Sequence, residues 1–121
     1  MTFIRSLLLV CGIAFAAQVA AQGSGETFES VRALAMKGDY QAQRNLAFGY
    51  TSLPYQGQDK SALLGCAWRT VIIHSGNARV DETDVLNYKV YCGPLDGVQS
   101  TAASAQARTL FKQIYRTTAP F

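Results

Sequence analysis

Apolar residues recur at steps of three and four through most of the chain after residue 25, which is the spacing of amphipathic helices. In residues 26–37, Phe28, Val31 and Ala35 share one such stripe. Glu26 and Glu29 lie where the dipole of a helix beginning there favours acids, and the pair Lys37-Gly38 is typical of a helix end. The pattern therefore predicts a first helix over residues 26–37.

Two further helices are predicted between residues 39 and 76. Asp39 is the expected N-cap of the second helix, and Pro54 ends it. Asp59 is the expected cap of the third, over about residues 60–75. The β-branched residues 71–73 also fit a strand, but the length of the helical stripe favours a helix. The expected buried faces are Ala42, Leu46, Gly49, Tyr50 and Leu53, and then Leu64, Ala67, Trp68, Val71 and Ile72.

The rest of the chain predicts a fourth helix over residues 81–92 and a fifth over about residues 96–117, separated by Gly93-Pro94. No stretch alternates convincingly as a strand does. The turn between the first two helices is so short that they must form an antiparallel hairpin. The fold class is therefore all-α, with about five helices in a single domain over residues 26–121. The apolar side chains expected on the last two helices are Val85, Leu86, Tyr88 and Val90, and then Ala103, Ala107, Leu110, Phe111 and Ile114.

Residues 1–21 have the layout of a secretory signal peptide, with Arg5, an apolar run over residues 7–17 and the small residues Val19-Ala20-Ala21. The apolar stretch is shorter than the roughly 20 residues of a membrane span. Cys11 follows Val10 and not a small residue, so a lipoprotein signal fits less well. We expect cleavage after Ala21, a flexible lead-in over residues 22–25, no membrane span after cleavage, and a periplasmic or secreted location.

Composition narrows the classes of function. Hydrophobic residues make up 49% of the chain, which excludes whole-chain disorder. After cleavage ten basic and eight acidic residues remain, and this dispersed net charge of +2 argues against a nucleic-acid partner. Two cysteines, Cys66 and Cys92, also remain. In an oxidising compartment a disulfide is the preferred reading, and two separate buried thiols are the alternative.

Several landmarks together resemble the Sel1-like repeats, a family related to the tetratricopeptide repeats. Residues 34–43, LAMKGDYQAQ, are similar to the junction between two such repeats. Leu46 with Tyr50 and, later, Asp59, Trp68 and Gly76-Asn77 fall in the family's order, although Ala47 replaces its usual glycine. The resemblance covers residues 35–77. It implies stacked antiparallel helix hairpins, a short α-solenoid, in which Gly38 makes a tight turn and Ala42 and Gly49 allow close helix approach.

The chain carries little candidate chemistry. The single histidine, His74, is two helical turns from Cys66, which is too far for direct activation. Asp81, Glu82 and Asp84 cluster at one helix start and are interpreted as caps and dipole partners. Two cysteines and a distant histidine are a poor zinc set. We therefore predict no catalytic residue, no metal site and no cofactor.

Two surface features are candidates for binding a partner. Arg108, Lys112 and Arg116 repeat every four residues and form a basic ridge, which is either a solvated helix face or a docking site for an acidic partner. Tyr55 is either an exposed interface anchor or folded back onto the hairpin. The leading hypothesis is a non-catalytic module that binds another envelope protein, in a sharper version an inhibitor or immunity-type binder. The alternatives are a small enzyme acting on cell-wall material and a purely stabilising protein.

Overall fold

The structure, a computed structural model, describes residues 25–121. The predicted signal peptide, Cys11 and most of the lead-in lie outside these residues. Over the described range the chain forms five α-helices and no strand, so the all-α prediction is confirmed. The helices are α1 (Phe28–Met36), α2 (Tyr40–Thr51), α3 (Ala62–His74), α4 (Glu82–Cys92) and α5 (Gly97–Tyr115).

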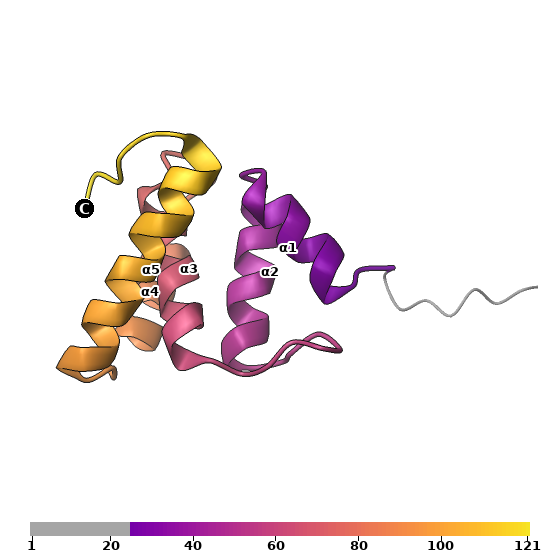
Figure 1. The fold of residues 1–121 in the computed structure, drawn as a ribbon, viewed down its shortest axis with the longest axis horizontal. Coiled ribbons are helices and arrows are strands. Elements are labelled where there is room, and N and C mark those ends of the chain that lie inside the picture. The colour runs from indigo at the N-terminus through magenta and orange to yellow at the C-terminus, as the bar shows by residue number, and fades with distance from the viewer. Residues whose placement is uncertain (1–24) are drawn as a thin grey trace, which may run out of the picture.

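Helix α3 is the centre of the domain. It packs against α2 on one side and against α4 and α5 on the other, while α1 packs mainly on α2 (Figure 1). The predicted faces of α1, α2, α3 and α5 meet in one core. Its largest fully buried apolar side chains are Trp68, Leu46, Ile72, Val31 and Val71.

Polar side chains begin the helices as local rules require. Thr27 caps α1, Asp39 accepts a hydrogen bond from the Ala42 N–H at the start of α2, and Asp96 caps α5. Gly38 lies just after α1 with φ +89°, a backbone conformation that side chains oppose, so the predicted tight turn is confirmed. These caps fix where each helix enters the core.

Three local predictions are wrong. Asp59 does not cap α3, because the Ser61 hydroxyl accepts the Leu64 N–H at 3.1 Å and moves the helix start to Ala62. Leu53 is 71% exposed, because α2 ends at Thr51 and turns this side chain away from the core. The close approach of α2 and α3 is made by Gly65 against Thr51, whereas Gly49 leaves room for the Gln58 side chain.

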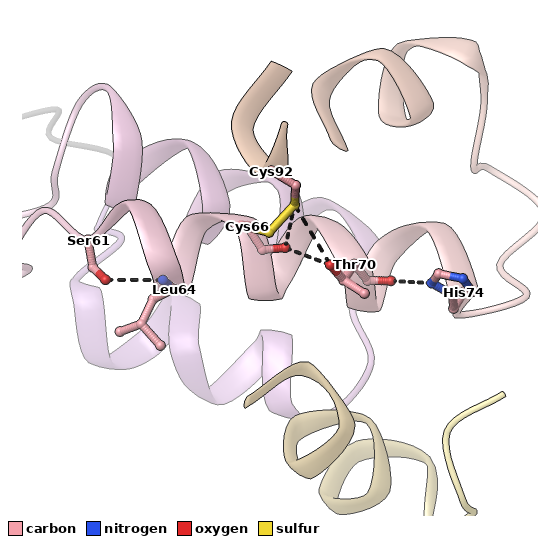
Figure 2. Close-up of a disulfide and its surroundings, with 6 residues drawn as sticks. All are labelled: Ser61, Leu64, Cys66, Thr70, His74 and Cys92. Carbon is pink, nitrogen blue, oxygen red and sulfur yellow. Dashed lines mark hydrogen bonds between the residues drawn. A yellow bond between two sulfur atoms is a disulfide. The ribbon is translucent and has the colours of Figure 1, made fainter. Parts of the chain in front are cut away.

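The predicted bond between Cys66 and Cys92 is present and joins α3 to the end of α4 (Figure 2). The two Cα atoms are 4.9 Å apart, and the bond closes a loop with a sequence separation of 26. Beside it, the Thr70 hydroxyl donates to the Cys66 carbonyl at 2.9 Å. The disulfide matters for α4 because Val85, Leu86 and Val90 on this helix stay 40–59% exposed and contribute little to the core.

Candidate interaction groove

A buried carboxylate connects α4 to α2. Asp84, 1% exposed, accepts hydrogen bonds from the Tyr40 hydroxyl at 2.5 Å and from the Asp81 N–H at 3.1 Å. The guanidinium Nε of Arg44 lies 3.2 Å from its other oxygen, without the alignment of a hydrogen bond. The helix-start role predicted for Asp81 and Asp84 is confirmed as a capping box. The sequence did not predict that Asp84 also holds Tyr40 and Arg44.

Aromatic and cationic groups surround this carboxylate. The guanidinium groups of Arg44 and Arg79 lie over the Tyr40 ring, 5.4 and 4.8 Å from its centre. Burial, and then the hydrogen bond to Asp84, raise the pKa of the Tyr40 hydroxyl. This hydroxyl is therefore protonated at neutral pH and donates to Asp84.

Beside the carboxylate is an open polar pocket of about 390 Å³ between α2, α3 and α4. Arg69 of α3 contributes to its lining although this residue is only 4% exposed. Its guanidinium carbon lies 5.4 Å from the centre of the Tyr91 ring. The complete lining is Gln41, Arg44, Asn45, Phe48, Arg69, Asn87 and Tyr91.

The electrostatics of the pocket are set by two neighbouring cations. Burial lowers the pKa of Arg69, the charge interaction with Tyr91 opposes this shift, and the positive charge of Arg44 lowers the pKa further. An arginine in a protein nevertheless keeps its proton at neutral pH. The side chain of Arg44 is 28% exposed, so solvent reaches this cation better than it reaches Arg69. The pocket therefore presents two guanidinium charges, one of them almost fully desolvated.

A second hollow of about 330 Å³ adjoins the pocket along α2, and Asn45 and Phe48 line both. The second hollow has an apolar side formed by Phe48, Leu53 and Pro54, and Tyr55 and Glu26 also line it. Phe48 and Leu53 are 46% and 71% exposed, which is unusual for large apolar side chains. We call the two adjoining hollows the α2 groove.

Tyr55, one of the residues predicted to bind a partner, lies in this groove. It is half-buried, packs against the edge of the core, and its hydroxyl lies 3.3 Å from the Glu26 carboxylate. The side chain thus folds back onto the domain and still lines an open surface. Gln58 fixes its loop, because this buried amide accepts the Tyr55 N–H at 3.1 Å and donates to the Leu46 carbonyl at 3.2 Å.

The predicted basic ridge lies elsewhere. Arg108, Lys112 and Arg116 are all exposed, and the last two line a separate hollow of about 440 Å³ with Thr109 and Gln113. This hollow shares no residue with the α2 groove. The structure therefore does not bring Tyr55 and the ridge together into one site.

The remaining candidate residues have structural partners. His74 is the last residue of α3, where its Nδ1 lies 2.9 Å from the Thr70 carbonyl (Figure 2). Its ring packs on Phe121. Within residues 25–121, no three histidine, cysteine or acidic side chains gather as a metal site would require. No helix in that range is long and apolar enough to cross a membrane.

Comparison of the chain with protein-family models, with curated proteins and with solved structures finds no match.

Proposed function

We propose that the protein is an exported, non-catalytic module that binds another envelope protein through the α2 groove. The observation that carries this proposal is the groove itself. It combines exposed apolar side chains, Phe48 and Leu53, with the Arg44 and Arg69 cations in two hollows that share Phe48. Large aromatic residues and arginines are the side chains on which protein interfaces depend most.

The polar groups support binding more than catalysis. His74 is the one histidine among the described residues. Its Nδ1 lies against the Thr70 carbonyl and its ring packs on Phe121, and no acidic side chain in that range hydrogen-bonds to it. Asp84 is committed to Tyr40, Arg44 and its own helix start. A general base must reach the proton that it removes, and neither of these groups is free to do so.

The disulfide supports an exported location. Cys66 and Cys92 form a bond that persists in oxidising compartments, in agreement with the signal peptide predicted from the sequence. We also propose, on the motif order and the consecutive packed helices, that α2 and α3 form a Sel1-like hairpin. In such a short solenoid, α4 and α5 would serve as a second, degenerate repeat or a cap.

The test is site-specific photo-crosslinking in the cells that produce the protein. A benzophenone amino acid replaces Phe48 in the groove or, as a matched control, Val98 on α5, which is 82% exposed. We expect a discrete crosslinked protein from position 48 and none from position 98. The same products from both positions, or none from position 48, would contradict the proposal.

A further inference from the structure

Arg69 is buried, but its side chain has a polar atom without a hydrogen-bond partner. The residue is 4% exposed, and its Nε is buried with no hydrogen-bond acceptor among the described residues. The Nε itself is closed off from the pocket, but the residue lines it, so a ligand acceptor there would bind the terminal amino groups of the same guanidinium. The Tyr91 ring contacts the guanidinium but offers no acceptor to the Nε.

The charge of the pocket defines the ligand. Arg44 and Arg69 contribute two positive charges, and beside them Arg79 and the Asp84 carboxylate, both in contact with Tyr40, contribute one charge of each sign. The other lining side chains are neutral. The pocket therefore attracts an anion, and a protein partner offers one on an aspartate or glutamate side chain. A carboxylate also matches the planar fork of a guanidinium group.

The position of the arginines shows how a ligand would lie. Gln41 lies one helical turn before Arg44 and Phe48 about one turn after it, and all three line the same pocket. The second hollow adjoins the pocket on the Phe48 side. A chain that runs from this hollow over Phe48 to the arginines presents a side-chain carboxylate to them, with an apolar neighbour against Phe48.

We propose that the pocket receives an aspartate or glutamate side chain of the partner protein, whose carboxylate accepts hydrogen bonds from Arg69 and Arg44 while an adjacent apolar residue packs on Phe48. This inference rests on the proposed function, because it names what the partner presents to the α2 groove. It makes Arg69 a residue that sets the specificity of the groove.

The probe is a capped pentapeptide, acetyl-Ala-Leu-Glu-Leu-Ala-amide, titrated into the ¹⁵N-labelled protein with its disulfide intact. The Nε–Hε resonance of Arg69, assigned by its loss in Arg69→Gln, reports on the guanidinium that the carboxylate would bind. We expect this resonance to shift with the glutamate peptide. The glutamine analogue should bind at least about tenfold more weakly, because it brings no charge to the two cations.

Variants separate the charge from its geometry. Arg69→Gln should abolish the binding, and Arg69→Lys, which keeps the charge but loses the fork, should weaken it less. Arg108→Gln, an exposed arginine outside the groove, is the matched control and should bind like the unmodified protein. Equal binding of both peptides, equal binding by Arg69→Gln, or no binding by any form would overturn the inference.

Two further probes test the source of the carboxylate. Acetyl-Ala-Leu-Leu with a free carboxyl end represents a chain terminus, and acetate represents a small free anion. Tighter binding of either one than of the glutamate peptide would overturn the side-chain assignment. The crosslink at position 48 keeps the two proposals apart: if it persists in Arg69→Gln at full yield, the groove still binds a partner but the carboxylate inference fails.

Discussion

Arg69 and Arg108 each lie within a long helix of the same small domain, yet their surroundings have almost nothing in common. Arg69 is 4% exposed on α3 and lies beside a second cation, Arg44, with the Asp84 carboxylate close to both. Arg108 is exposed on α5, in a row with Lys112 and Arg116. One pair of charges converges from two helices into a pocket, and the other three charges follow one helix face into solvent.

The difference shows that burial decides how strongly a basic side chain affects stability and binding. Exposed charges are screened by salt within about 10 Å, and each contributes little to stability or affinity. A buried guanidinium interacts strongly with whatever stands beside it and destabilises the fold when an N–H is left without an acceptor. We therefore expect the pocket to affect both stability and binding, and the ridge to affect neither strongly.

The largest effect should come from Asp84→Asn. The change leaves Arg44 and Arg69 without their negative neighbour and weakens the contacts to Tyr40 and to the α4 start. Breaking a buried ion pair typically lowers the free energy of unfolding by about 3 to 5 kcal/mol. Urea denaturation followed by circular dichroism measures this loss of stability. The exposed Asp59→Asn is the control. If Asp84→Asn lowers the free energy of unfolding by less than about 1 kcal/mol, the pocket charges behave like surface charges and the contrast with the ridge is wrong.

The disulfide should rank second. Replacing Cys66 and Cys92 with alanine removes a closed loop of 26 residues, which lowers the free energy of unfolding by about 3 kcal/mol on the chain-entropy model. The loosened element is α4, which supplies Asn87 and Tyr91 to the pocket, whereas the ridge is on α5. Amide hydrogen exchange should therefore rise more in α4 than in α5. Reductant added to the double variant is the control and should change nothing, and equal loosening of both helices would contradict the assignment.

Much of the fold follows from the sequence because its determinants are local. The apolar stripes, the Asp39 and Asp96 caps and the Gly38 turn act over three or four residues, so periodicity and capping rules locate the helices. The wrong cap at Asp59 is also local: Ser61 lies two residues on and is an equally good N-cap type. The sequence offers no basis for choosing between two such residues.

The pocket could not be predicted because its residues are distant in sequence. Tyr40 and Asp84 are 44 residues apart, and their hydrogen bond exists only once α4 has packed. Arg69 has no periodic partner in sequence, whereas the ridge repeats every four residues and attracts attention for that reason alone. The one available signal was the arginine within an apolar helix face, next to Trp68 in a segment otherwise rich in leucine, valine and isoleucine.

Arg69→Met should sharpen the comparison with an effect of opposite sign. Methionine has a similar length, removes the buried charge with its unpaired Nε, and leaves the contact between Arg44 and Asp84 in place. Because burying a cation is costly, we expect the free energy of unfolding to rise by about 1 kcal/mol while peptide binding is lost. The matched Arg108→Met should stay within about 0.5 kcal/mol of the unmodified protein. A clear loss of stability in Arg69→Met would show that the guanidinium stabilises the free fold.

The smallest effect should come from neutralising the whole ridge, with glutamine at positions 108, 112 and 116. Arg116 ends α5 with φ 60°, and glutamine meets the same backbone strain there, so the helix end is preserved. Removing three exposed charges should change the free energy of unfolding by less than about 0.5 kcal/mol and leave the crosslink at position 48 unchanged. If that crosslink disappears while Arg69→Gln retains it, the ridge and not the pocket provides the charge that the partner recognises. For recognition of the partner, the spacing of cations along one helix would then matter more than the burial of a single cation.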